Sequence, residues 1–162
     1  MTSKAIRIAA TIAVALGVSV TNAASEELAI TIDTQRTTYT YWEVGDQIGH
    51  YIGSYNQGGT VTFPDGEVGT HTASGTYDYV HGKGTYLAYA RYDFDDGSTI
   101  VEQRRGEGSL ASDGTRLSKG YSNFIAGTGR YEGVTGNGLH ECTSANNSAP
   151  ITCKLRVYVR LP

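Results

Sequence analysis

Two oppositely charged residues, Glu102 and Arg104, stand two positions apart in a stretch of alternating apolar and polar residues. In a β-strand such positions share one face of the sheet, and Ile100 falls on that same face. If Ile100 points into a core, a carboxylate and a guanidinium point there with it, which is costly unless the pair is well hydrogen-bonded or used. Glu102 and Arg104 are therefore candidate catalytic groups. The alternative is that this strand end is solvated and that residues 102–105 form an ordinary charged surface.

The preceding predicted strand, residues 84–94, supplies aromatic groups. Its more apolar face alternates small side chains with rings, an arrangement that would leave a tapered space inside a barrel. We expect Tyr92 to act with Glu102 and Arg104 in catalysis. The residues expected to contact a ligand are Tyr86, Phe94 and Ile100.

Other kinds of catalytic site have no supporting pattern. The four histidines are dispersed, and His71 and His81 lie near predicted turns, where we expect them to be exposed. The sequence contains no Gly-x-Ser-x-Gly elbow, and its carboxylates sit mostly in turns rather than in a glycosidase-like pair. We expect neither a metal ion nor an organic cofactor.

The chain contains two cysteines, Cys142 and Cys153. An even pair in an exported protein indicates a disulfide, here between two strands joined by the turn-forming residues 143–152. The alternative is a metal-binding or catalytic thiol, which no CxxC or Cys/His spacing supports.

Residues 1–23 have the layout of a secretory signal peptide. Lys4 and Arg7 precede an apolar run over residues 8–20, and small residues surround a cleavage position after Ala23. A membrane anchor would need roughly 20 apolar residues, and this run has about 13. We therefore expect a secreted or periplasmic protein with no membrane span, whose residues 24–162 form one domain.

The mature chain is mildly acidic. The leader carries two of the 13 basic residues and none of the 16 acidic ones, so the remainder has a formal net charge of −5. It has no basic run of the kind that binds nucleic acid, and we expect no nucleic-acid partner.

After the leader the pattern is that of a β-protein, because short alternating runs are separated by Asp-Gly and other turn signals. About eight strands are predicted, over residues 28–41, 61–63, 74–80, 84–94, 98–107, 120–126, 134–142 and 153–161. Closure into a barrel would remove the exposed strand edges, and an eight-stranded barrel has room for packed side chains or one small ligand. The alternative architecture is a β-sandwich.

Three segments resemble the allene oxide cyclase barrel-like family, which is related to the plant dirigent proteins. They are GDQIG at 45–49, YDFDDGSTI at 92–100 and AGTGRYEGVTG at 126–136. Gly-Thr-Gly in the third segment precedes no helix, so it is not a phosphate-binding loop. We expect it to be a tight connection that needs positive φ, with Tyr131 packing back as a plug.

The resemblance implies an all-β, eight-stranded antiparallel closed barrel of calycin-like shape, with a partly apolar lumen. It further implies assembly as a homotrimer or homodimer and a place among bacterial-type exported members. Relatives cyclise a fatty-acid epoxide, steer phenoxy-radical coupling or catalyse cyclisations in bacterial secondary metabolism. Residues 27–34 depart from the acidic first strand of the plant cyclases, so we match their catalytic carboxylate to no particular residue here, which weighs against allene oxide cyclisation itself.

The expected function is to bind a small apolar or aromatic molecule in the lumen and to steer its cyclisation, isomerisation or elimination, as an isomerase or lyase does. Orientation and electrostatic preorganisation would supply the catalysis. The alternatives are a non-catalytic, dirigent-like ligand-binding module and a structural or interaction domain whose barrel is filled by side chains.

Overall fold

The computed structural model describes residues 25–146 and 149–161. The predicted signal peptide, residues 1–23, lies outside this part of the chain. Within the described residues, no helix is both long enough and apolar enough to cross a membrane.

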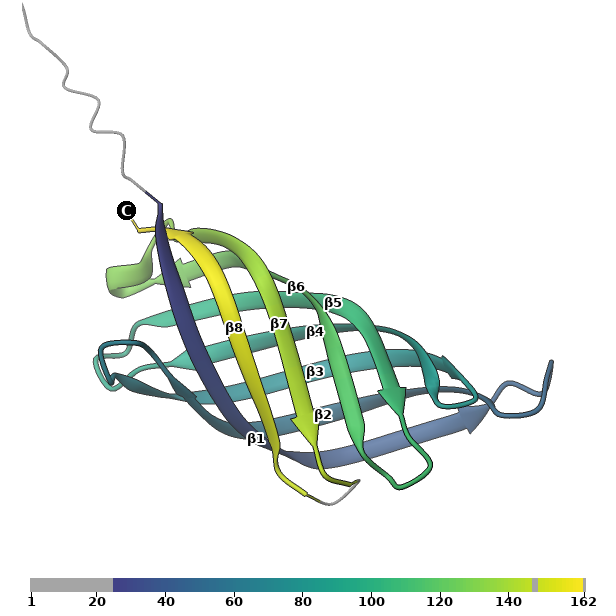
Figure 1. Cartoon of the computed structure of the whole chain (residues 1–162). Coiled ribbons are helices and arrows are strands. Elements are labelled where there is room, and N and C mark those ends of the chain that lie inside the picture. The colour runs from purple at the N-terminus through teal and green to yellow at the C-terminus, as the bar shows by residue number, and fades with distance from the viewer. Residues whose placement is uncertain (1–24, 147–148, 162) are drawn as a thin grey trace, which may run out of the picture.

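Eight antiparallel strands form one closed barrel in which each strand pairs with its neighbours in the sequence (Figure 1). The strands are β1 (Glu26–Glu43), β2 (His50–Thr62), β3 (Val68–Val80), β4 (Lys83–Asp93), β5 (Thr99–Leu110), β6 (Arg116–Thr128), β7 (Thr135–Ser144) and β8 (Ile151–Arg160). The last strand closes the barrel onto the first, with Leu155 opposite Ile30. The prediction of an all-β, eight-stranded antiparallel barrel is confirmed, and the sandwich alternative is wrong.

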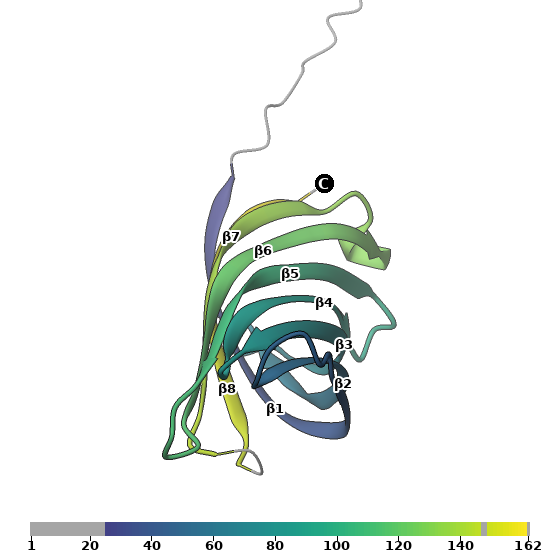
Figure 2. The ribbon, with the colours of Figure 1, turned by 90° about the vertical axis from the view of Figure 1, so that its right-hand side faces the viewer.

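Period-two alternation decides which side chains fill the barrel. In β8 the buried residues alternate strictly with exposed or half-buried ones, as the sequence pattern predicted. The same alternation in β4 buries Ala88, Ala90 and Tyr92 and leaves Leu87 and Tyr89 exposed. The wrap of the strands around this interior is visible in Figure 2.

One end of the barrel is closed by aromatic side chains. The short 3-10 helix η1 (Gly129–Tyr131) places the Tyr131 ring 5.0 Å from the Phe94 ring and 6.4 Å from the Phe63 ring. Gly129 has φ +61°, and a Cβ on Gly127 would lie 2.2 Å from the Tyr131 carbonyl oxygen. The glycine-rich segment is therefore the predicted tight connection, and Tyr131 is the plug.

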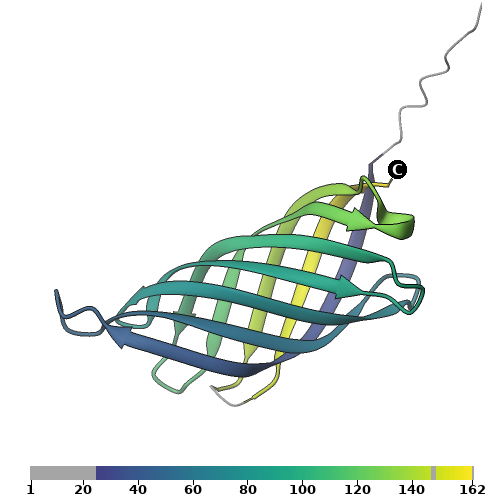
Figure 3. The same cartoon turned by 180° about the vertical axis from the view of Figure 1, so that it is seen from behind.

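The opposite end of the barrel is formed by the β1–β2, β3–β4, β5–β6 and β7–β8 connections. Figure 3 shows the β1–β2 loop and η1 at opposite ends of the molecule. Because all strands are antiparallel, every second connection lies at the same end. The residues that line the interior near this end come from the ends of β1, β3, β5 and β7 and from the starts of the strands that follow them.

The second strand is much longer than predicted, covering His50–Thr62 rather than residues 61–63. Glycines obscured it in the sequence, yet they are needed for close approach to neighbouring chains. A Cβ on Gly59 would lie 2.1 Å from the Asp33 carbonyl oxygen, and one on Gly53 would lie 2.4 Å from the Tyr77 hydroxyl. Glycine is uncommon inside strands, so its presence hid this strand in the sequence. It is needed here because the neighbouring chain leaves no room for a side chain.

The predicted disulfide is confirmed. Cys142 on β7 is directly opposite Cys153 on β8, with a Cα–Cα distance of 4.0 Å, and the two sulfur atoms are bonded. Both residues face the interior, so the disulfide forms part of the inner wall near the β7–β8 connection.

Candidate functional site

A charged pair lies inside the barrel. Glu102 and Arg104 on β5 are 0% and 4% exposed, so both point inward and the surface-charge alternative is wrong for them. Arg104 Nη2 donates to Glu102 Oε2 at 2.7 Å and to the Tyr92 hydroxyl at 2.9 Å. Tyr92, on the neighbouring strand β4, donates its hydroxyl hydrogen to the same carboxylate oxygen. The structure thus brings the three predicted catalytic residues into one hydrogen-bonded group.

The charges of this group follow from burial and pairing. Burial opposes ionisation of Glu102, but the charge and hydrogen bonds of Arg104, with those of Ser122 and Tyr92, hold its pKa below the ordinary value. Burial, followed by the nearby Glu102 charge, raises the pKa of Tyr92 well above normal. At neutral pH the group therefore contains a carboxylate, a guanidinium and a protonated phenol.

A second hydrogen-bonded chain connects Tyr86, His140 and Ser122. The Tyr86 hydroxyl bonds to His140 Nε2, and the Ser122 hydroxyl lies 2.9 Å from His140 Nδ1. Burial, with a smaller contribution from Arg104, lowers the pKa of His140 to about 4. His140 is therefore neutral at neutral pH. In the tautomer with the hydrogen on Nε2 it donates to Tyr86 and leaves the phenol hydrogen free for another acceptor, and Ser122 then donates to Nδ1 instead of to Glu102.

His71 was expected to be exposed, and that expectation is wrong. It is 0% exposed, its ring centre lies 5.8 Å from that of Tyr92, and neither ring nitrogen has a hydrogen-bond partner among the described residues. The strand was predicted to begin at residue 74, but β3 begins at Val68, so His71 lies within it on the inward face. Burial, and then the Arg104 charge, lower the pKa of His71 to about 3.

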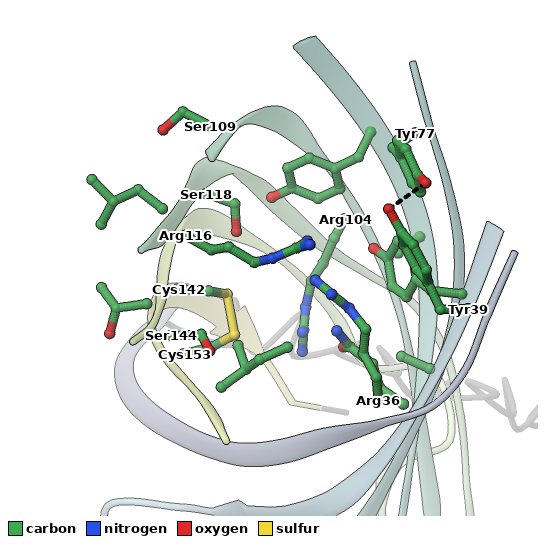
Figure 4. Close-up of a pocket in the computed structure, with 18 of the residues that line it drawn as sticks. Arg36, Tyr39, Tyr77, Arg104, Ser109, Arg116, Ser118, Cys142, Ser144 and Cys153 are labelled. Atoms are coloured by element: carbon green, nitrogen blue, oxygen red, sulfur yellow. Dashed lines mark hydrogen bonds between the residues drawn. A yellow bond between two sulfur atoms is a disulfide. The ribbon is translucent and has the colours of Figure 1, made fainter. Parts of the chain in front are cut away.

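A hollow of about 80 Å³ opens beyond the charged pair, toward the end that the plug does not close (Figure 4). Arg104 and the Cys142–Cys153 disulfide form part of its wall. The tyrosines that line it are Tyr39, Tyr55, Tyr77, Tyr79 and Tyr86. Two further arginines, Arg36 and Arg116, complete its charged lining.

The tyrosine wall is ordered by ring contacts and hydrogen bonds. The rings of Tyr39 and Tyr77 are nearly parallel, with an interplanar angle of 5° and centres 5.6 Å apart, and the Tyr77 hydroxyl donates to that of Tyr39 at 2.5 Å. Burial raises the pKa of Tyr55 to about 12. Tyr55 is therefore protonated at neutral pH, and the wall as a whole presents both a flat apolar surface and hydroxyl groups.

A β-bulge in β1 helps to build this wall. The register with β2 shifts between Arg36 and Thr38, so an additional residue enters the strand at that point. The bulge allows Arg36 and Tyr39, which are three positions apart, to line the same hollow. Strict alternation would have placed them on opposite faces, and the sequence carries no glycine or proline there to indicate the bulge.

The predicted site residues lie at different depths. Tyr86 and Arg104 line the hollow, and Glu102 and Tyr92 lie behind Arg104 in the buried layer. Phe94 and Ile100 belong to the apolar core instead, and Phe94 packs against the plug. The separation arises because Tyr86 and Phe94 are eight positions apart, which corresponds to about 26 Å of extended chain. One inward face therefore runs from the mouth to the closed end.

Most of the tyrosine and arginine lining was missed from the sequence. Tyr77 and Tyr79 lie on the predicted strand 74–80, and their period-two spacing was the available signal. Tyr55 was hidden by the glycines of β2, and Arg36 by the bulge. These residues come from three consecutive strands, β1, β2 and β3, and the register of their pairing brings them together.

The arrangement can bind a flat molecule and donate hydrogen bonds to one of its oxygens. Tyr86 and Arg104 are a phenol and a cation on one inner wall, each held from behind by other buried groups. Such preorganised donors stabilise negative charge that develops on an oxygen during a reaction. In the described part of the chain, no three His, Cys, Asp or Glu side chains are grouped so that they could hold a metal ion.

Among known proteins, solved structures are similar to this chain. No protein-family model matches the chain, and no curated protein matches it. The pterocarpan synthase dirigent protein PsPTS1 is similar with a TM-score of 0.47 and 13% identity, over 85% of this chain and 97% of that one. The pterocarpan synthase dirigent protein GePTS1 is similar with a TM-score of 0.49 and 12% identity, over 94% of this chain and 100% of that one.

Proposed function

We propose that this barrel binds a small aromatic molecule in the tyrosine-lined hollow and steers its isomerisation, cyclisation or elimination. The observation that carries the proposal is the position of Arg104, which lines the hollow on one side and is hydrogen-bonded to buried Glu102 and Tyr92 on the other. A buried charged group at the base of a hollow costs stability and is a recognised mark of a functional site.

The size of the hollow limits what enters it. Ligand pockets commonly measure several hundred cubic ångströms, whereas this hollow measures about 80 Å³. One ring of the ligand would occupy it, between Tyr55 and Tyr86, while the rest of the molecule remained in the mouth. Stacking and edge contacts with the tyrosines would fix the ring plane.

Arg104 and Tyr86 would carry the chemical step. The ligand oxygen would receive hydrogen bonds from the Arg104 guanidinium and the Tyr86 phenol as negative charge developed on it. His140, neutral and bonded to Tyr86, would hold that phenol in position. All three reactions in the proposal can pass through such an oxyanion, and binding one conformation of the ligand would select the product.

Native mass spectrometry of the protein purified from its source tests this function. We expect a bound small aromatic molecule on the wild type and on Lys119→Trp. Ser118→Trp should lose it, because Ser118 lines the hollow whereas Lys119, the next residue of β6, is exposed on the outside. Both variants add the same bulk to one strand, so the pair separates a blocked hollow from a general effect of tryptophan.

The recovered molecule is then incubated with fresh protein and its products are separated by chromatography. We expect conversion by the wild type, and by Tyr86→Phe a rate lower by about 10²–10³-fold with binding retained. A wild-type protein that carries no ligand would contradict the binding proposal. A ligand that is bound but returned unchanged would contradict the catalytic part and favour a carrier.

We also propose that the protein is exported, as a secreted or periplasmic protein. The leader-like residues 1–23 and a disulfide, which persists in oxidising compartments, support this localisation. N-terminal sequencing of the protein from its source is expected to begin at residue 24 or 25. A mature chain that retained Met1 would contradict the proposal.

A further inference from the structure

The charge around the hollow is strongly one-sided. Arg36 from β1, Arg104 from β5 and Arg116 from β6 all line it, and Figure 4 shows them entering from different sides of the wall. Among the described residues that line it, none is an aspartate or a glutamate. The chain as a whole has more acidic than basic residues, so this concentration of arginine does not follow from composition.

The three arginines are not equivalent. Arg104 is paired with Glu102, whereas no carboxylate in the described part of the chain lies within 4.0 Å of Arg36. Burial, followed by the like charge of Arg116, lowers the pKa of Arg36. The Arg36 guanidinium lies 5.2 Å from the centre of the Tyr39 ring, and that of Arg116 lies 6.0 Å from the same ring. Two cations thus share one aromatic side chain.

Unused hydrogen-bond donors provide a second, independent observation. The Nε atoms of Arg36 and Arg104 are buried and have no hydrogen-bond partner within residues 25–146 and 149–161. Arg104 is more than nine-tenths buried and still lines the hollow. A buried donor without a partner is costly. These two atoms have almost no accessible surface, so a ligand acceptor would reach Arg36 through its terminal Nη atoms, and the unpaired Nε atoms show that the protein itself does not fill the hydrogen-bonding capacity of either guanidinium group.

We infer that the ligand is an aromatic acid, whose carboxylate binds to Arg36 at the mouth while its ring enters the hollow. The planar guanidinium matches a carboxylate in a paired, charge-assisted geometry. The negative charge would also relieve the repulsion between Arg36 and Arg116. The tyrosine wall, with Tyr39 and Tyr77 stacked beside the arginines, supplies the flat contact for the ring.

This inference rests on the proposed function, and a matched pair of probes separates the two. Benzoate and benzamide have the same shape and differ in charge. Chemical-shift titrations of the ¹⁵N-labelled protein at neutral pH are expected to show both probes at the hollow, with benzoate bound about tenfold more tightly or better. Added salt should weaken the binding of benzoate and leave the binding of benzamide nearly unchanged.

Arg36→Gln is expected to reduce the affinity for benzoate about tenfold and to change that for benzamide by less than about threefold. The control is Arg156→Gln, which removes the same charge from an exposed position on β8 and should alter neither. Thermal melting of both variants establishes that they fold.

The outcomes of these titrations separate the aromatic-acid inference from the proposed binding of a small aromatic molecule. Equal binding of the two probes, or an equal loss of both in Arg36→Gln, would overturn the aromatic-acid inference and leave the binding function standing. Shifts confined to the exposed Tyr41 and Trp42 of the β1–β2 hairpin, or no binding of either probe, would overturn both.

Discussion

Replacing Glu102 with leucine is expected to lower the free energy of unfolding by about 3–5 kcal/mol at neutral pH. Among the described residues, the substitution leaves the buried Arg104 guanidinium with the Tyr92 hydroxyl as its one side-chain hydrogen-bond partner. Arginine does not lose its proton in proteins, so the charge cannot be relieved by deprotonation. Urea denaturation monitored by circular dichroism measures the loss.

The loss of stability caused by Arg104→Met is expected to become smaller as the pH falls. Without the guanidinium, burial would raise the pKa of Glu102 above its ordinary value, so the carboxyl group could become neutral. The stability lost by Arg104→Met should therefore be partly recovered between pH 7 and pH 5, whereas that lost by Glu102→Leu should not.

The double variant Glu102→Leu/Arg104→Met is expected to recover most of the loss, because neither member of the buried pair is left without its partner. Gln103→Leu is the control, since residue 103 lies on the same strand with its side chain on the outward face. A double variant as unstable as Glu102→Leu would show that the cost comes from packing and not from the unpaired charge.

Acid is expected to destabilise the protein below about pH 6.5, before most carboxylates are protonated. His71 and His140 have pKa values lowered by burial to about 3 and about 4, while in the unfolded chain both titrate near the ordinary value of 6.5. Between these limits the unfolded state binds more protons, so stability falls as the pH falls. Each histidine contributes up to about 1.4 kcal/mol per pH unit.

Between pH 6.5 and pH 4.5, the fall in stability with falling pH comes from these two histidines. The pKa of Glu102 is lowered from 4.5, so its contribution is lost only below that pH. His50 acts in the opposite direction: Asp46 and Asp78 raise its pKa, so its stabilising effect is present below pH 6.5 and is lost as the pH rises further.

His71→Leu is expected to reduce the pH dependence in this window by about half, because one of the two proton-binding differences disappears. Thr72→Leu, at the next position of β3 with its side chain on the outward face, removes no titrating group and should leave the dependence unchanged. Proton NMR titration of the histidine rings provides the direct measurement. A His71 ring that titrates near pH 6.5 in the folded protein would contradict the prediction.

The common face of Glu102, Arg104 and Ile100 could be predicted from the sequence because it depends on local geometry alone, whereas the sequence did not decide between burial of that face and a solvated alternative. Glu102 and Arg104 share a face with Ile100 in any β-strand, and strand identity followed from alternation and an Asp-Gly turn. The same reasoning failed for His71, since the strand start could not be located among residues such as Gly69 and Gly75, whose missing side chains accommodate Phe94 and Tyr55.

The residues predicted to contact a ligand do point into the barrel, but the sequence did not show how far along the barrel axis each one lies. Tyr86 on β4 and Phe94, which directly follows β4, do both point inward, but one lines the hollow and the other packs on the plug. Alternation specifies inside or outside and says nothing about position along the barrel axis. That position depends on how the eight strands tilt and stagger on closure.

The all-β class, the approximate strand count, the disulfide between Cys142 and Cys153 and the common face of Glu102, Arg104 and Ile100 were predictable from the sequence. Each of these depends on periodicity, turn chemistry or pairing within short stretches of chain. The three-dimensional arrangement was needed to show that this face lies inside the barrel and that Arg36 joins Arg104 around one hollow, since a bulge turns Arg36 inward and barrel closure brings the strands together. Contacts between distant strands depend on register and stagger, which no local pattern in the sequence encodes.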